Sequence, residues 1–128
     1  MNLLLDTHAL IWWLTRSASL SARASAAIDH ADNRVHVSAA SAWEIATKVR
    51  LGKLQLPGRA LATFDELPEL AGFVALDVDW RHAALAGSWK IAHRDPFDRL
   101  LAAQSKLERL AIVTMDPAFR AFAVKTLW

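Results

Sequence analysis

Short apolar runs separated by longer amphipathic segments set the pattern of this chain. Each run ends at polar residues, as the buried strands of a parallel sheet do. We predict strands at Leu3 to Leu5, Arg34 to Ser38, Phe73 to Leu76, Ala111 to Thr114 and Val124 to Leu127. Because helical segments fall between the runs, we expect an α/β fold whose central, mainly parallel sheet of four to five strands is covered by helices on both faces.

Capping and turn residues locate the helices. Side chains of serine and aspartate accept hydrogen bonds from the first N–H groups of a helix, and glycine commonly ends one. We predict helices at Thr7 to Leu14, Ala22 to Ala31 after Ser21, Ala39 to Leu51 before Gly52, Pro57 to near Pro68, Asp79 to about Ala86 and Asp95-Pro96 to Glu108, with a short helix before the last strand.

Composition narrows the class of protein. The 128 residues suit one domain, and a hydrophobic fraction of 54% is enough for a real core. The absence of cysteine excludes a disulfide framework and a thiolate zinc site. Apolar runs are too short to cross a bilayer, and the N-terminal run lacks the basic region of a signal peptide, so we expect a cytoplasmic protein without membrane partners. The net charge of +2 says little about other partners.

Four carboxylates stand where a predicted strand ends or a helix begins: Asp6, Glu44, Asp98 and Asp116. The carboxyl ends of the strands in an open parallel sheet share one edge, where ligands bind, so acids far apart in sequence can meet there. Such acids raise one another's pKa unless a cation neutralises them. Carboxylate oxygens suit a hard divalent ion such as Mg²⁺ or Mn²⁺, which predicts metal-dependent chemistry on phosphate.

Each acid also has a local structural interpretation. Asp6 and Asp116 could cap the helices that follow them, and Asp95 before a proline fits a helix start as well. Glu44 has Lys48 one helical turn away, which suits a surface ion pair. The residues alone leave these structural interpretations open beside the metal-binding one.

The motifs around these acids resemble the PIN domain, in particular the VapC-type toxins of bacterial type II toxin–antitoxin pairs. The resemblance rests on Leu4-Leu5-Asp6-Thr7-His8-Ala9-Leu10, Ser41-Ala42-Trp43-Glu44-Ile45, Leu51-Gly52-Lys53-Leu54, Asp95-Pro96-Phe97-Asp98-Arg99-Leu100-Leu101-Ala102-Ala103-Gln104 and Val113-Thr114-Met115-Asp116. It runs from about Leu3 to Phe119. It implies a three-layer α/β/α sandwich, with residues 1–128 forming a single PIN domain.

The resemblance also implies an activity, that of a Mg²⁺- or Mn²⁺-dependent endoribonuclease acting as a toxin. The metal-binding and catalytic residues would be Asp6, Glu44, Asp98 and Asp116, with Asp95 as an accessory acid. Many relatives carry an asparagine followed by a later aspartate in the last motif. Asp116 stands at the asparagine position here, so the fourth ligand departs from the family pattern.

Supporting residues complete the expected site. The hydroxyls of Thr7 and Ser38 could orient a ligand or water, or could cap helices. We expect Lys48, Arg94 and Arg99 to contact the RNA backbone, and such contacts position the nucleic acid without reading its sequence.

The same family likeness implies partners. These are a homodimeric copy of the chain and a cognate antitoxin that blocks the site. Trp12 and Trp13, adjacent on one helix, cannot both face the same core and are candidate contact residues, whereas Trp43 and Trp89 are expected to pack in the core. The alternative interpretation is a catalytically silent PIN-like module that binds RNA or a protein.

Overall fold

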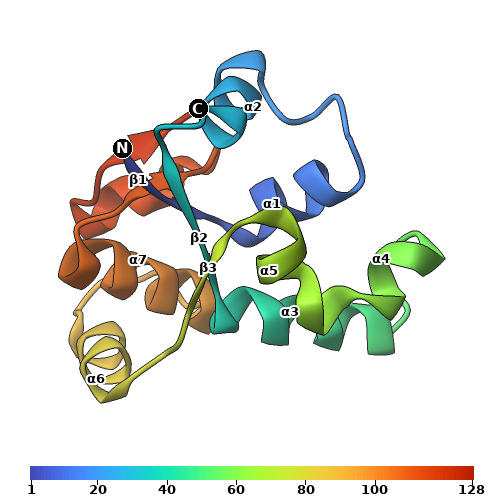
Figure 1. Cartoon of the computed structure of the whole chain (residues 1–128). Coiled ribbons are helices and arrows are strands. Elements are labelled where there is room, and N and C mark those ends of the chain that lie inside the picture. The colour runs from blue at the N-terminus through green and yellow to red at the C-terminus, as the bar shows by residue number, and fades with distance from the viewer.

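Helices flank a five-stranded parallel sheet in the computed structural model, which describes residues 1–128 (Figure 1). The strands are β1 (Asn2–Leu5), β2 (Arg34–Ser38), β3 (Val74–Leu76), β4 (Ala111–Val113) and β5 (Thr126–Leu127). Their order across the sheet is β3-β2-β1-β4-β5, and every neighbouring pair is parallel. The predicted α/β class is confirmed, and the sheet is parallel throughout.

The helical elements follow the expected order along the chain. They are α1 (Thr7–Leu14), α2 (Ala22–Asp29), α3 (Ala39–Arg50), α4 (Gly58–Ala62), the 3-10 turn η1 (Phe64–Glu66), α5 (Leu67–Ala71), α6 (Trp80–Ser88), α7 (Pro96–Glu108) and the 3-10 segment η2 (Pro117–Phe122). None of these helices has the length and apolar character needed to span a bilayer.

The helix predicted from Pro57 to Pro68 is wrong in its boundaries. The chain interrupts it at Thr63, passes through η1 and starts a new helix, α5, in whose first turn Pro68 lies. Proline has no N–H to donate, and a first turn is where a helix needs none, so Pro68 begins this helix and does not end one. The helix ends at Gly72, whose φ of 71° is readily adopted by glycine.

The central strand β1 is buried on both faces, which fixes the position of the residue after it. Leu3 and Leu5 pack into a core cluster with residues of α1, α2 and α3, and Leu4 packs on the opposite face with Leu101 and Phe119. This alternation follows from the two-residue period of a strand. The carboxyl end of β1 is therefore held from both sides of the sheet.

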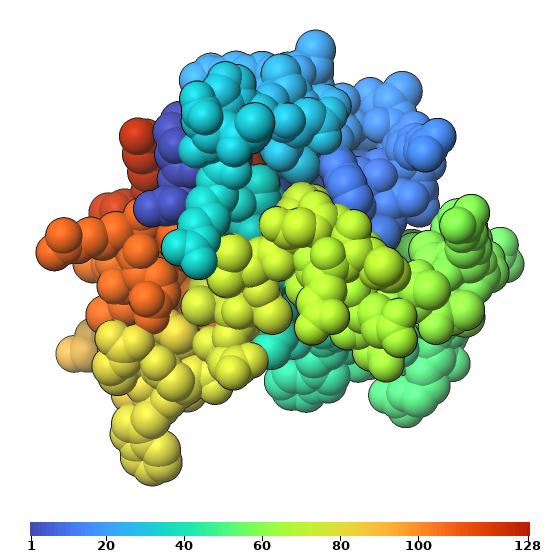
Figure 2. All heavy atoms as spheres, in the orientation of Figure 1, coloured from blue at the N-terminus to red at the C-terminus, as the bar shows by residue number.

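The strand order reverses its direction at β1. The chain leaves β1 for β2 on one side and later adds β4 on the other side, and this reversal of direction is where open parallel sheets bind ligands. In Figure 1, β2 runs directly into α3. Figure 2 shows α3, in blue-green, between the yellow α6 and the green α4–α5 segment.

Candidate metal centre

Asp6 follows β1 and is only 4% exposed. Its Oδ1 accepts a hydrogen bond of 2.7 Å from the Ala9 N–H and so caps α1, and its own N–H donates to the Val113 carbonyl. Burial raises the pKa of Asp6 above its ordinary value, against the hydrogen bonds from Thr114 and Ala9, and Asp116 raises it further. A charged Asp6 is thus costly where it stands, which favours a nearby cation.

Thr114 connects the first and last predicted acids. Its side chain hydrogen-bonds to the Asp6 carboxylate, and its Oγ1 accepts from the Asp116 N–H at 3.0 Å. Asp116 itself is exposed and caps η2, with Oδ1 accepting from the Ala118 N–H at 2.9 Å. The ends of β1 and β4 therefore hold two carboxylates close enough to influence each other.

Asp98 lies in the first turn of α7, where its Oδ2 is 2.8 Å from His93 Nε2. The pKa of Asp98 is raised to about 6, first by burial and further by the charges of Asp95 and Glu44, with His93 opposing the shift. Sequence reasoning did not pair His93 with Asp98. The only available signal was a histidine five residues before the acid, which does not determine how the loop between them folds.

Glu44 projects from α3 and is 5% exposed. Its Oε2 pairs with Lys48 Nζ at 2.8 Å, and its charge reaches Asp98 across the contact between α3 and α7. Thr7 Oγ1 and Ser41 Oγ share a buried hydrogen bond of 3.0 Å that links α1 to α3. The residues after β1 and β2 are thereby held together.

The capping interpretation is confirmed for four of these residues, whereas Thr7 bonds Ser41 and caps no helix, and the ion pair of Glu44 with Lys48 involves a buried glutamate. Asp6, Asp95 and Asp116 cap helices, and Ser38 does the same through the Ala40 N–H. Each of three carboxylates uses one oxygen in such a contact. The capping bond occupies Oδ1 of Asp116, the contact with His93 occupies Oδ2 of Asp98, and the ion pair with Lys48 occupies Oε2 of Glu44. Capping and metal binding can therefore coexist on the same side chain.

The predicted acids approach one another without forming a tight cluster. No three of them have ligand atoms within 4.8 Å of one another. Two electrostatic groups exist instead, Asp6 with Asp116 and Asp98 with Asp95 and Glu44. The donor set consists of carboxylate oxygens, several of them buried, and such a set fits a hard divalent cation.

Arg99 has a structural position that the sequence did not predict. Its guanidinium donates hydrogen bonds of 2.6 to 3.0 Å to four backbone carbonyls, those of Ala86, Trp89, Ile91 and His93. These bonds use Nε, Nη1 and Nη2 and fix the segment between α6 and α7. The geometry gives no support to the RNA contact expected of Arg99, whereas Arg94 is exposed to solvent.

Trp12 and Trp13 are half-buried and face different partners. The ring of Trp12 lies 5.7 Å from that of Trp128, and the ring of Trp13 lies 4.8 Å from that of Phe73. Each residue therefore covers a different part of the fold, as expected for neighbours on one helix.

The expectation of a core position holds for Trp89 and is wrong for Trp43. Trp89 is half-buried against Phe122, and Trp43 is 62% exposed. The buried face of α3 carries Ala40, Ser41, Glu44 and Ile45. Trp43 lies about 100° from Glu44 on the side opposite Ile45, which places it outside the buried face.

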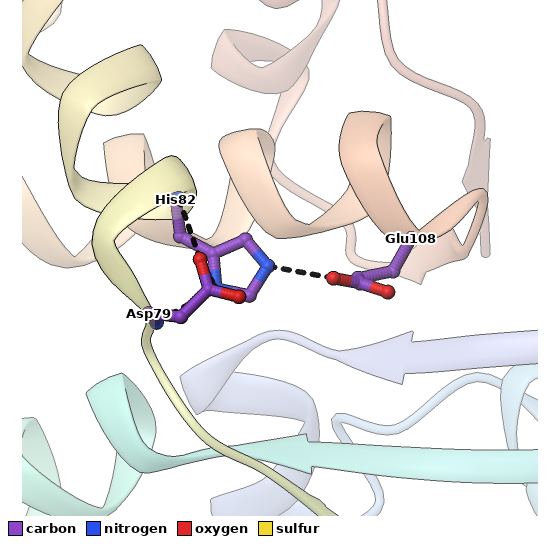
Figure 3. A group of neighbouring side chains, drawn as sticks. All are labelled: Asp79, His82 and Glu108. Atoms are coloured by element: carbon purple, nitrogen blue, oxygen red, sulfur yellow. Dashed lines mark hydrogen bonds and ion pairs between the residues drawn. The ribbon is translucent and has the colours of Figure 1, made fainter.

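A second group of potential metal ligands lies outside the predicted site. Asp79, His82 and Glu108 bring ligand atoms within 4.8 Å of one another, and Figure 3 shows the His82 ring of α6 pointing toward Glu108 of α7. His82 Nδ1 accepts from the Asp79 N–H at 3.0 Å, and Nε2 lies 2.9 Å from Glu108 Oε1. Arg81 pairs with both carboxylates. With both ring nitrogens engaged and an arginine already supplying charge, this group joins two helices and leaves no free histidine ligand.

Comparison with known proteins places the chain among related sequences and structures. Residues 3–125 match the family described as PIN domain. The chain is 33% identical over 122 residues to Ribonuclease VapC22 of Mycobacterium tuberculosis, covering 94% of this chain and 91% of that protein.

Solved structures agree with this match. The FitAcB crystal structure from Neisseria gonorrhoeae is similar at a TM-score of 0.67 and 26% identity, over 100% of this chain and 97% of that one. The crystal structure of VapBC2 from Rickettsia felis, bound to a promoter DNA fragment, is similar at a TM-score of 0.73, over 99% of this chain and 98% of that one. At 13% identity, the second comparison shows the fold alone.

Proposed function

Because the chain belongs to the PIN-domain family, we propose that it is a divalent-metal-dependent endoribonuclease that hydrolyses RNA phosphodiester bonds. One observation supports the proposal: Asp6 and Asp116 follow β1 and β4, Glu44 and Asp98 lie near the starts of α3 and α7, and burial together with neighbouring acids raises the pKa of Asp6 and of Asp98. The metal-binding and catalytic residues are Asp6, Glu44, Asp98 and Asp116. A cation that accepts their oxygens relieves the repulsion.

Mg²⁺ or Mn²⁺ is the ion that this oxygen donor set suits. When bound, it lowers the pKa of a water molecule and stabilises negative charge on the phosphoryl oxygens. Neighbouring residues orient the carboxylates that would hold the ion. Thr114 and the Ala9 N–H orient the Asp6 carboxylate, and His93 orients that of Asp98. Such partners fix ligand geometry before the substrate arrives.

Other residues support these acids and the RNA. Asp95 raises the pKa of Asp98 and caps α7, the helix that carries Asp98. The hydroxyls of Thr7 and Ser38 make hydrogen bonds in the first turns of α1 and α3. Lys48 and Arg94 are the cations that we assign to the RNA backbone. Lys48 is half-buried against Glu44, so it neutralises an acid until a metal ion or a phosphate competes for either partner.

The biological role that we propose is that of the toxin of a type II toxin–antitoxin pair. The similarity to Ribonuclease VapC22 and to the FitAcB structure supports it. Under this proposal the chain forms a homodimer, and a cognate antitoxin covers the metal site.

RNA cleavage by the purified chain tests the proposal. Total cellular RNA is incubated with partner-free protein and Mg²⁺ or Mn²⁺, in parallel with EDTA. Asp6→Asn should abolish metal-dependent cleavage because it removes a ligand without changing core volume, while Asp79→Asn, which alters an acid outside the site, should leave it unchanged. An Asp6→Asn variant as active as the parent would remove Asp6 from the mechanism. RNA left whole by every metal would favour the catalytically silent module.

A further inference from the structure

Trp43 presents an indole to solvent beside the candidate metal site. It is 62% exposed on α3, directly before the buried Glu44. Its ring meets that of Phe97 edge-on, with centroids 4.9 Å apart and an interplanar angle of 81°. Phe97 directly precedes Asp98 in the first turn of α7. The aromatic pair therefore spans the same junction of α3 and α7 as the carboxylates of Glu44 and Asp98.

The contact with Phe97 holds the indole in place without covering it. An edge-to-face pair at this spacing is favourable and covers one face of only one of the two rings, so at least one face of the indole stays open. More than half of the Trp43 surface stays in water, although a tryptophan gains much by burial. An aromatic side chain that is both fixed and open is preorganised to bind a flat ligand, because little conformational freedom remains to be lost.

We propose that Trp43 stacks on an unpaired base of the RNA, next to the phosphate at the metal site, with Phe97 as the side chain that positions the indole. This inference rests on the proposed function and names its substrate class, which is single-stranded RNA or an unpaired loop. Bases inside a duplex already stack on their neighbours, so only unpaired bases can stack on an aromatic side chain. Every base has an aromatic face, so this contact is tolerant of sequence.

The chain contains a matched control for this proposal. Trp80, at the start of α6, is 89% exposed. The acid before it, Asp79, is paired with Arg81 and belongs to the group that joins α6 to α7. Trp80 therefore shares the exposure of Trp43 and its position beside an acid, without the predicted metal site.

Binding measured separately from cleavage tests the stacking. Fluorescence anisotropy with Mg²⁺ present, on an Asp98→Asn background that keeps the RNA whole, compares a short labelled oligouridylate with an abasic oligomer of the same length. Trp43→Ala should weaken oligouridylate binding about tenfold or more. Trp43→Phe should retain most of the affinity, Trp80→Ala should change nothing, and the abasic oligomer should bind the parent and Trp43→Ala equally.

Three results would overturn the stacking. One is oligouridylate binding that Trp43→Ala leaves unchanged, and another is an equal loss for the abasic oligomer, which would assign the contact to the backbone. The third is a change of oligomeric state in Trp43→Ala, seen by sedimentation, which would place Trp43 in a protein interface. Metal-dependent cleavage by the parent separates the two proposals: if it persists, only the stacking fails, and if the parent neither binds nor cleaves RNA, both fail.

Discussion

Asp98 shows how burial at a single residue couples stability to pH. Its pKa rises from an ordinary 3.8 to about 6 on folding, so between these values the folded chain binds more protons than the unfolded chain. Stability must then fall as pH rises through that window. The pKa of Asp6 is shifted in the same direction.

The thermal stability of the metal-free protein should therefore decrease from about pH 4 to about pH 6. Asp98→Asn should remove part of this decrease and raise the melting temperature above pH 6, because the amide carries no charge to bury. Thermal denaturation across this range in EDTA measures both effects. A variant with the parent's slope would show that Asp98 titrates as an ordinary surface carboxylate.

Arg99 should matter for stability more than for RNA binding. Arg99→Ala removes three hydrogen bonds to the loop before α7 and one to Ala86 of α6, and it leaves these carbonyls without their donor, at a cost of about 2–4 kcal/mol. Arg99→Lys should recover little of it, because an ammonium cannot reproduce the planar fork of donors. Urea denaturation with Arg94→Ala as the exposed control tests this, and equal stability of all variants would contradict it.

Sequence reasoning at the residue scale succeeded where strand ends alone determine position. Asp6 and Asp116 follow buried strands, so their placement at one edge was predictable. The pairing of His93 with Asp98 and the four bonds of Arg99 depend on how the segment between α6 and α7 folds. The exposure of Trp43 depends on how α3 is rotated against the sheet. Glu44 has an apolar residue on each side, Trp43 and Ile45, so the sequence does not determine which of the two is buried.

At the scale of elements, α6 and α7 form a unit joined through a buried histidine. His82 is 1% exposed and contacts the Asp79 cap and Glu108 at the end of α7. The pKa values of Asp79 and Glu108 are lowered, mainly by Arg81 and His82 respectively. The stabilisation from these acids is therefore present above their ordinary pKa values and is lost as pH falls below them.

Removing Glu108 should loosen this pair of helices. Glu108→Ala leaves the buried Nε2 of His82 without its partner, which costs about 1–3 kcal/mol. Glu69→Ala, on the exposed face of α5, should cost almost nothing. Chemical denaturation of both variants checks the difference, and an equally stable Glu108→Ala variant would show that solvent satisfies His82 as well as Glu108 does.

The boundaries of elements were predictable only where a single residue determines them. Gly52 and Ser21 mark the helix ends that the sequence suggested. Pro68 alone does not determine a boundary, because a proline is common both just after the end of a helix and in the first turn of the next one. The segment from Pro57 to Gly72 contains the end of α4 and the start of α5, and only the packing of the segment decides which of these Pro68 marks.

For the whole molecule, the alternation of strands and helices predicted the parallel sheet. The complete order β3-β2-β1-β4-β5 did not follow from the sequence, because alternation leaves open on which side each later strand is added. That order brings the ends of β1, β2 and β4 next to each other, and Asp6 and Asp116 follow two of these strands directly.

Titration calorimetry with Mn²⁺ tests the metal site most directly, because it distinguishes the predicted acids from the group of Asp79, His82 and Glu108, and only the predicted acids should bind the ion. The parent should bind Mn²⁺, Asp6→Asn should lose most of that binding, and Glu108→Gln should retain it. Binding that survives in Asp6→Asn and disappears in Glu108→Gln would assign the metal to the group between α6 and α7 and contradict the proposed nuclease centre.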